Sequence, residues 1–329
     1  MPASAAPIFA VTNCLPATAL DALRGAGELR IDERSEAIPR GALLELVRGA
    51  EAILTLLHDR VDEELLEAAG PQLRCVANVA VGYDNVDLEA AARRGVAVTN
   101  TPGVLDDATA DLTLALILAA TRRLAEGDRL IRAGRAWAWG MSFMLGSGLR
   151  GKLLGIVGLG GIGWRVAERA RAFGMEIAYH SRHPAPDEVV AELGAERLPL
   201  DRLLARADVL SLHCPLTPET HHLIGIKELE SMKPSAVLVN AARGPLVDEG
   251  ALADALAAGE IAAAALDVYE REPRVEPALL GLENVVLSPH LGSATVETRT
   301  AMAELAARNA ISVLRGEGPL TPVPSQSIG

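Results

Sequence analysis

Three polar side chains in the last third of the chain could together process a small carboxylic acid. Arg243 lies in VNAARG, Glu272 in ALDVYEREP and His290 in VVLSPHLGSAT, and each follows an apolar run that predicts a strand. A guanidinium can clamp a carboxylate through two hydrogen bonds, and an imidazole can transfer a proton. A glutamate bonded to the other ring nitrogen would fix the histidine tautomer and favour the protonated ring near neutral pH. These residue types match the reduction of a 2-oxo acid.

A glycine-rich loop predicts a dinucleotide-binding site. Gly158-x-Gly160-x-x-Gly163 directly follows the predicted strand KLLGIVG and opens a predicted helix, which is the context that makes this motif informative. The first glycine allows a tight turn, the second lets the backbone approach a pyrophosphate, and the third lets the helix lie close to the strand. The N–H groups around Gly161 and Ile162 are expected to face the anion.

The next predicted strand, MEIAYH, indicates which dinucleotide is bound. In NAD-binding folds an acid about 20 residues after the glycines binds the ribose hydroxyls, but here the strand runs into His180, Ser181, Arg182 and His183. A hydroxyl and a guanidinium suit a 2′-phosphate. We therefore expect NADPH, with NADH as the alternative if Arg182 is an ordinary solvated loop residue.

The elements that must position these residues follow a repeating strand–helix pattern. Continuous apolar runs, as expected for strands covered by helices on both faces, occur before residue 101 in PIFAVTN, EAILTL, LRCVANV and VAVTN. After a break at Thr101-Pro102-Gly103, a long helix is expected over 104–124. A second series follows in KLLGIVG, MEIAYH, DVLSLH, SAVLVN, IAAAALDV and NVVLSPH, and a last helix is expected over 293–315. This pattern predicts an α/β fold with two doubly wound parallel-sheet domains.

Composition and charge narrow the function classes. The 329 residues are 50% hydrophobic, 22% charged and only 3% aromatic, which is typical of a globular α/β chain of two domains. The net charge of −12 disfavours nucleic acid and anionic lipid as partners. Cys14, Cys75 and Cys214 are too far apart for a zinc site or a disulfide framework. With no metal site, leader or membrane span expected, the protein is predicted to be cytoplasmic.

Several long motifs occur in an order that resembles the D-isomer-specific 2-hydroxyacid dehydrogenase family, most closely its glyoxylate/hydroxypyruvate reductase branch. The resemblance covers nearly the whole chain through NVAVGYDNVD, TPGVLDDATADLTLALILAATRR, GLRGKLLGIVGLGGIG, SLHCPLTPETHHLIG, VNAARGPLVDEGAL, ALDVYEREP and SPHLGSAT. It implies a Rossmann cofactor domain, expected at 103–288, inserted into a flavodoxin-like catalytic (substrate) domain of residues 1–102 and 289–329. Two positions depart from the common pattern: Gly161 replaces an Arg or Lys, and Trp164, which we interpret as a packing residue, follows the glycines.

The resemblance also implies roles for individual residues. Arg243, Glu272 and His290 fall on the catalytic arginine, glutamate and histidine of the family. The N–H groups of Val81 and Gly82 fall on its substrate-carboxylate loop, and Ser293 is expected to contact the substrate. Further positions match the cofactor site: Thr109 and Asp267 near the nicotinamide, Pro215 near the adenosine, and Ala241, His290 and Gly292.

The expected activity is hydride transfer from NAD(P)H to C2 of glyoxylate or hydroxypyruvate, giving the D-2-hydroxy acid. Reduction of 2-ketogluconate and D-lactate or phosphoglycerate dehydrogenase activity are alternatives, because the residues fix only the 2-oxo acid end of a substrate. An alternative of another class is an NAD(H)-sensing, corepressor-like binding protein, which the complete catalytic trio disfavours. Reduction of a 2-oxo acid panel separates these alternatives.

The segment RAWAWGMSFMLGSGL, which contains Trp137 and Trp139, lies between the long helix and the glycine loop. In the family this region forms a homodimer, and the resemblance implies that Trp139 reaches the substrate pocket of the partner subunit. The alternative is that both tryptophans only fill the dimer interface, where tryptophan is often an energetic anchor.

Overall fold

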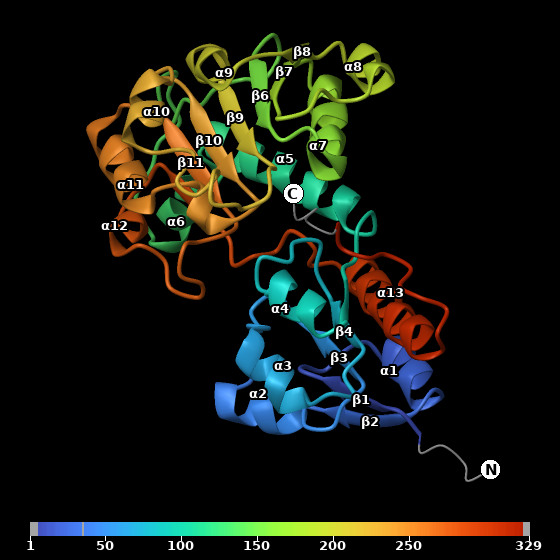
Figure 1. The fold of residues 1–329 in the computed structure, drawn as a ribbon. Helices are drawn as coiled ribbons and strands as arrows, with labels where there is room; N and C mark the ends of the chain where they lie inside the picture. The colour runs from blue at the N-terminus through green and yellow to red at the C-terminus, as the bar shows by residue number, and fades with distance from the viewer. Residues whose placement is uncertain (1–5, 35, 325–329) are drawn as a thin grey trace, which may run out of the picture. The chain divides into compact units, whose positions relative to one another are not determined.

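The computed structural model describes residues 6–34 and 36–324. The chain divides into two units (Figure 1). Unit 1 is Met1–Leu105 with Thr295–Gly329, and unit 2 is Asp106–Ala294.

Unit 1 is built on a parallel sheet with the strand order β2-β1-β3-β4-β5, which is the flavodoxin-like order. Its strands are β1 Ile8–Val11, β2 Glu28–Ile31, β3 Ala52–Thr55, β4 Cys75–Asn78 and β5 Ala97–Thr99. The two strands β3 and β4 are buried along their whole length, in agreement with their continuous apolar runs.

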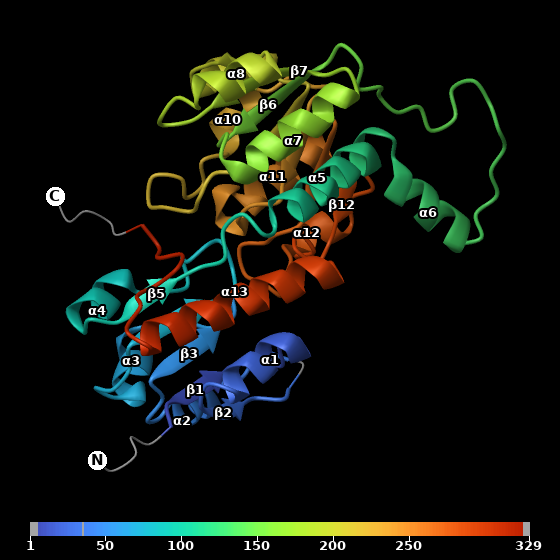
Figure 2. The same cartoon turned by 90° about the vertical axis from the view of Figure 1, so that its right-hand side faces the viewer.

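Helices cover both faces of this sheet. They are α1 Ala17–Arg24, α2 Arg40–Leu46, α3 Glu63–Ala69, α4 Leu88–Arg93 and α13 Val296–Leu314. The α1 and α13 helices pack together on one face, while α2, α3 and α4 follow one another on the other (Figures 1 and 2). Asp62 and Asp87 accept hydrogen bonds from the first turns of α3 and α4, which explains why these helices start there.

Strand β2 was not among the elements expected from the sequence. Its residues, ELRI, alternate charged and apolar side chains, and none of them is fully buried because β2 is an edge strand. A search for continuous apolar runs therefore misses it.

Unit 2 is built on a parallel sheet with the order β12-β11-β10-β9-β6-β7-β8. Its strands are β6 Leu153–Val157, β7 Glu176–His180, β8 Glu196–Arg197, β9 Val209–Leu212, β10 Val237–Asn240, β11 Ala263–Leu266 and β12 Val285–Leu287. The order reverses between β6 and β9, as in a Rossmann sheet. The two sheets confirm the predicted fold class.

The helices of unit 2 also lie on both faces of its sheet. They are α5 Asp106–Thr121, α6 Leu124–Arg132, α7 Gly161–Ala172, α8 Asp187–Leu193, α9 Leu200–Arg206, α10 Ile226–Ser231, α11 Glu249–Ala258 and α12 Pro277–Leu280, with a 3-10 turn at Gly244–Leu246. Contacts join α5, α7 and α8 in one layer and α9, α10, α11 and α12 in the other. Apolar side chains from each layer meet the sheet in separate core clusters.

The helix expected over 104–124 is confirmed as α5, Asp106–Thr121. The helix α6 that follows was not expected; it begins after Arg123, whose φ of 54° is left-handed. Figure 2 shows α6 and the following residues 133–148 projecting beyond the other helices of unit 2. Among the described residues, no helix is long and apolar enough to cross a membrane.

Candidate active site

Arg243, Glu272 and His290 follow three neighbouring strands of unit 2. Their strands β10, β11 and β12 are adjacent and parallel, so their carboxyl ends lie at one edge of the sheet. Ligands collect at this edge in doubly wound folds. The structure therefore brings together the three residues singled out from the sequence.

Glu272 and His290 form a direct pair. Nδ1 of His290 lies 2.9 Å from Oε2 of Glu272, and the other carboxylate oxygen accepts a hydrogen bond from the N–H of Tyr269. Burial raises the pKa of Glu272, but the hydrogen bond and charge of His290 outweigh this effect, so its pKa lies below the ordinary value. The pairing through Nδ1 leaves Nε2 as the nitrogen that can act on a ligand.

Asp267 holds the turn that carries His290. One carboxylate oxygen of Asp267 accepts from the N–H of Leu291 at 2.7 Å and from Oγ of Ser288 at 2.5 Å, and the other accepts from the N–H of Gly292 at 2.8 Å. His290 has a left-handed φ of 55°, and its N–H donates to the Asp267 carbonyl. A left-handed φ is uncommon for a residue other than glycine. The hydrogen bonds to Asp267 hold the turn in this conformation and so determine where the imidazole points.

The loop that carries Arg243 packs against the loop that carries Glu272. The side-chain amide of Asn240 donates to the Arg243 carbonyl at 2.8 Å, and Nη1 of Arg243 donates to the Ala242 carbonyl. A Cβ atom at Gly244 would overlap the backbone of Tyr269, so the close approach of these loops depends on glycine. Arg243 is near enough to Glu272 to contribute to its lowered pKa.

The glycine loop has the geometry that its motif predicts. Gly158 adopts a φ of 95°, and a Cβ atom there would lie 2.7 Å from the backbone of His213 and Cys214. A Cβ atom at Gly163 would overlap the Gly158 carbonyl, whereas nothing lies within 4 Å of one at Gly160. The loop is thus closed where the fold needs contact and open where a ligand could approach.

The N-terminus of α7 offers free donors beside this opening. The helix begins at Gly161, and Trp164 donates its N–H to the Gly160 carbonyl, so the preceding N–H groups at Gly161 and Ile162 have no helical acceptor. Such a terminus suits a pyrophosphate. The site therefore fits a dinucleotide. Trp164 packs against the core cluster beneath the helix, in agreement with its interpretation as a packing residue.

Two more of the predicted cofactor residues meet at the turn after His290. Thr109 in α5 donates its hydroxyl to the Gly292 carbonyl at 3.2 Å, and both residues are buried. Ser293 follows and is partly buried. Ala241 is buried after β10, and Pro215 is exposed after β9, so both also follow carboxyl ends of strands in this sheet.

The tip of β7 carries a feature that the sequence did not indicate. Nη2 of Arg197, in β8, donates to the carbonyls of Ser181 at 2.9 Å and Arg182 at 3.1 Å. The Ser181 hydroxyl donates to the His183 carbonyl, and the Arg182 side chain is exposed. Arg197 thus shapes the turn predicted to meet a 2′-phosphate. This role of Arg197 depends on β8 pairing beside β7, where Arg197 lies opposite Tyr179. The short strand β8 was not expected from the sequence, so the role could not be predicted.

In unit 1, Val81 and Gly82 follow β4 in a loop whose carbonyls are held by side chains. The Val81 carbonyl accepts from Nδ2 of Asn100 at 2.8 Å, and the Gly82 carbonyl accepts from Nδ2 of Asn78 at 2.9 Å. Neither asparagine was singled out from the sequence.

Segment 133–148 exposes large apolar side chains. Trp139 is 79% exposed and Met141 is 82% exposed, while Trp137 stacks on Phe143 with ring centroids 6.2 Å apart. Trp139 thus lies on the surface of this chain. Among the described residues, no hydrogen bond or ring contact joins it to Arg243, Glu272 or His290.

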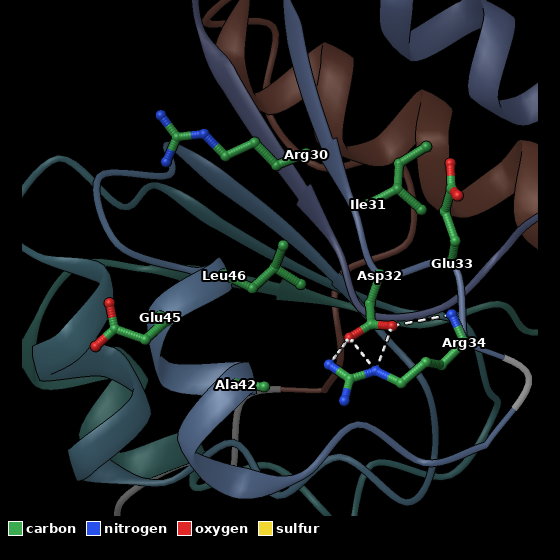
Figure 3. A pocket seen from close by; sticks show the side chains of 8 residues that line it. All are labelled: Arg30, Ile31, Asp32, Glu33, Arg34, Ala42, Glu45 and Leu46. Carbon is green, nitrogen blue, oxygen red and sulfur yellow. Dashed lines mark hydrogen bonds and ion pairs between the residues drawn. The ribbon is translucent and has the colours of Figure 1, made fainter.

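A further pocket lies in unit 1 beside β2 and α2 (Figure 3). Of its charged groups, Arg34 binds Asp32 through several hydrogen bonds, and Arg30 binds Glu28 and the Arg48 carbonyl outside the pocket. It contains none of the residues predicted to do chemistry.

Comparisons with known proteins agree with this arrangement. A family model described as "D-isomer specific 2-hydroxyacid dehydrogenase, NAD binding domain" matches residues 114–292. A glyoxylate reductase of Thermococcus litoralis is 50% identical over 318 residues, which is 95% of each chain. A glyoxylate reductase of Pyrococcus furiosus is 48% identical and covers 98% of this chain and 96% of its own.

Solved structures show the same relationship. The glyoxylate reductase of Paecilomyes thermophila matches with a TM-score of 0.88 and 38% identity over 99% of this chain and 100% of that one. The NADPH-dependent glyoxylate/hydroxypyruvate reductase of Sinorhizobium meliloti, solved with NADP and malonate, matches with a TM-score of 0.83 and 36% identity over 97% of each chain. The resemblance noted in the sequence is confirmed, and the chain belongs to the D-isomer specific 2-hydroxyacid dehydrogenase family.

Proposed function

We propose that this protein is an NAD(P)-dependent reductase of glyoxylate and hydroxypyruvate that forms the D-2-hydroxy acid. The observation that carries the proposal is the 2.9 Å pair of Glu272 and His290 at the carboxyl edge of the sheet that also bears the glycine loop. A proton donor and a dinucleotide loop on one sheet are the requirements of carbonyl reduction. The near 50% identity to glyoxylate reductases over almost the whole chain supports this substrate class.

In this proposal each residue of the trio has a separate task. His290 donates a proton from Nε2 to the substrate carbonyl oxygen, since Nδ1 is bonded to Glu272. The carboxylate of Glu272 stabilises the protonated ring that must be present before reduction. Arg243 binds the substrate carboxylate and polarises the ketone through its guanidinium.

Unit 2 is proposed to bind the cofactor, and unit 1 to supply substrate contacts. When bound, the nicotinamide supplies the hydride that reaches C2 of the substrate. The N–H groups of Gly161 and Ile162 would hold the pyrophosphate, and Thr109 and Gly292 would lie on the nicotinamide side. In unit 1, the N–H groups of Val81 and Gly82 are proposed to bind the substrate carboxylate.

NADPH is proposed as the preferred cofactor, with the exposed guanidinium of Arg182 and the Ser181 hydroxyl as contacts for the 2′-phosphate. No acidic residue ends β7, where an NAD-dependent enzyme would place one. The solved reductase of Sinorhizobium meliloti, which is NADPH-dependent, supports this choice.

We propose a homodimer formed through α6 and residues 133–148. This region exposes several large apolar side chains, among them Leu124, Ile131, Trp137, Trp139 and Met141. Several large exposed apolar side chains within one segment are typical of a protein interface. Trp139 is proposed to reach the substrate pocket of the partner subunit.

A panel of 2-oxo acids tests the activity. The purified protein should oxidise NADPH with glyoxylate and hydroxypyruvate, one cofactor for each product molecule, and hydroxypyruvate should yield D-glycerate. Faster turnover of pyruvate or 2-ketogluconate would reassign the substrate. Binding of the cofactor without reduction of any panel member would indicate a sensing protein instead.

A further inference from the structure

Three consecutive carbonyl groups in the loop after β4 are each held by a donor. The Ala80 carbonyl accepts from the N–H of Thr101 at 2.9 Å. The Val81 carbonyl accepts from Nδ2 of Asn100 at 2.8 Å, and the Gly82 carbonyl accepts from Nδ2 of Asn78 at 2.9 Å. Because Thr101 and Asn100 are neighbours, the first two carbonyls turn toward the same segment.

The direction of these carbonyls determines the direction of the N–H groups. In a planar trans peptide the C=O and the next N–H point opposite ways. The N–H groups of Val81 and Gly82 must therefore face away from residues 100–101, and that of Tyr83 must face away from Asn78. Among the residues that the structure describes, none accepts a hydrogen bond from these three N–H groups. Successive free N–H groups form a concave site for an anion.

Asn78 is placed by a network that satisfies its whole amide. It is fully buried, and its Oδ1 accepts from the Thr55 hydroxyl at 3.1 Å and from Asn85 at 3.3 Å. Its Nδ2 is shared between the Gly82 carbonyl and Asn85. Asn85 in turn donates to two carbonyls after β3, those of Leu56 and Asp59. A buried network with every member satisfied is rigid.

Residues in the C-terminal part of the chain hold the backbone of Asn100 in position. Its N–H donates to the Thr321 carbonyl at 3.2 Å, and its carbonyl accepts from the Thr321 hydroxyl at 2.7 Å. Asn309, fully buried in α13, binds the Thr321 backbone N–H and hydroxyl. The backbone of Asn100 is thus anchored without its side chain, and the side-chain amide is left to bind Val81.

We propose that Asn78 and Asn100 are positioning residues that aim the backbone N–H groups of Val81, Gly82 and Tyr83 at the carboxylate of the substrate. This inference rests on the proposed function, which supplies the carboxylate. The asparagine amides reach Val81 and Gly82 through the carbonyls of these residues, so they act on the substrate through the backbone. Without the two amides, the peptide planes can rotate and the N–H groups lose their common direction.

Asn100→Ala is the more informative variant, because the backbone of Asn100 keeps its bonds to Thr321. We expect a rise of about tenfold in KM for glyoxylate, the size of one lost hydrogen bond. The kcat should change much less, and KM for NADPH should stay the same. Oxamate, a carboxylate that resembles the substrate, should bind more weakly by a similar factor in calorimetry.

Gln72→Ala is the matched control. Gln72 also lies in unit 1 and donates its side-chain amide to backbone carbonyls, those of Ala50 and Ala69, but near the amino end of β4. It should alter thermal stability without changing KM or oxamate binding. Asn100→Leu keeps the branched shape of the side chain and removes the donor, so it should reproduce the effect of Asn100→Ala.

An unchanged KM and oxamate affinity in folded Asn100→Ala would overturn the proposal. Unfolding of both Asn100 variants, with Gln72→Ala folded, would also overturn it by showing that the amide serves stability alone. If the unmodified protein does not reduce glyoxylate, the proposed function fails. In that case a weaker oxamate affinity in the Asn100 variants still supports the positioning role. If the unmodified protein does not bind oxamate at all, the positioning role is overturned as well.

Discussion

Nδ1 of His290 lies 2.9 Å from Oε2 of Glu272, although the two residues follow different strands. His290 holds this position with a left-handed φ of 55°, and Asp267 binds the turn on both sides of it. The lowered pKa of Glu272, which burial opposes and His290 causes, shows that the carboxylate is stabilised in its charged form. The pair therefore leaves Nε2 of His290 as the ring nitrogen that faces a ligand.

Removal of this charge should change the pH dependence of reduction. In Glu272→Gln the neutral amide no longer carries the charge that pairs with Nδ1 of His290, so the pH above which kcat/KM falls should move down. Because the pKa of Glu272 is lowered, the pair also stabilises the folded protein at neutral pH. This contribution is lost as pH falls through the folded pKa of Glu272.

The pH profile of kcat/KM for glyoxylate measures this effect. Glu270→Gln serves as the control, since Glu270 binds a different histidine, His222, at 3.1 Å in the same segment. Its profile should match that of the unmodified protein. A profile that does not move in Glu272→Gln would remove Glu272 from its role beside His290.

His290→Ala should separate chemistry from cofactor binding. Loss of the proton donor should lower kcat by about a hundredfold or more. The glycine loop keeps its contacts, so the Kd for NADPH, measured by fluorescence titration, should change less than threefold. His222→Ala, which removes a histidine also paired with a glutamate, should keep kcat. A His290→Ala protein with near-normal kcat would require a different acid.

The positions of Arg243, Glu272, His290 and the glycine loop could be predicted because each follows a recognisable apolar run. In a parallel sheet such a run already indicates at which edge the next residue lies. The roles of Asn78, Asn100 and Arg197 could not be predicted in this way. Each depends on which distant segments pair, such as Asn100 with Val81, and no local pattern carries that information.

The helix α6 could not be predicted for a similar reason. The sequence indicates that α5 ends near residue 124, but nothing in it requires Arg123 to adopt a left-handed φ or a second helix to follow. After α6, the N–H of Ser147 donates to the carbonyl of Thr121 at 2.8 Å, and this hydrogen bond returns the chain to the end of α5. This contact joins residues 26 positions apart, so it appears only in the folded chain.

The preference for NADPH should depend on Arg182. Arg182→Ala removes a charged hydrogen-bond donor to the 2′-phosphate, so the ratio of kcat/KM for NADPH over NADH should fall by about tenfold. Most of the change should come from KM for NADPH. Arg206→Ala is the control, because Arg206 is also exposed in unit 2 but is paired with Glu196. Equal or better use of NADH by the unmodified protein would defeat the assignment.

Asp106 should weaken cofactor binding through its charge. Its carboxylate lies against Gly161 at the start of α7, where a Cβ atom would overlap it. Burial, with a contribution from Asp107, raises the pKa of Asp106, so its charge is unfavourable in the folded protein above the ordinary pKa. Asp106→Asn should bind NADPH about two- to fivefold more tightly at neutral pH and low salt.

The same substitution should raise the free energy of unfolding at neutral pH. The gain should fade as pH falls toward the pKa of Asp106, where the natural carboxyl is already neutral. Asp111→Asn is the control, because Asp111 is exposed one turn further along α5 and is bonded to Arg169 at 2.5 Å. An unchanged or weaker Kd in Asp106→Asn would show that this carboxylate does not act on the pyrophosphate.

Complementation between two damaged chains tests whether Trp139 acts in the partner subunit. Trp139→Ala and Arg243→Ala should each be poorly active alone. When the two are co-expressed and mix at random, about half of all dimers are mixed. If Trp139 serves the partner, each mixed dimer has one site with both lesions and one with neither, so about a quarter of all sites work normally. If Trp139 serves its own subunit, every site in a mixed dimer carries one lesion. Specific activity no greater than the mean of the two parent variants would then reject the contact with the partner. Co-expression of Trp137→Ala with Arg243→Ala is the control, because it shows whether a recovery of activity is particular to Trp139.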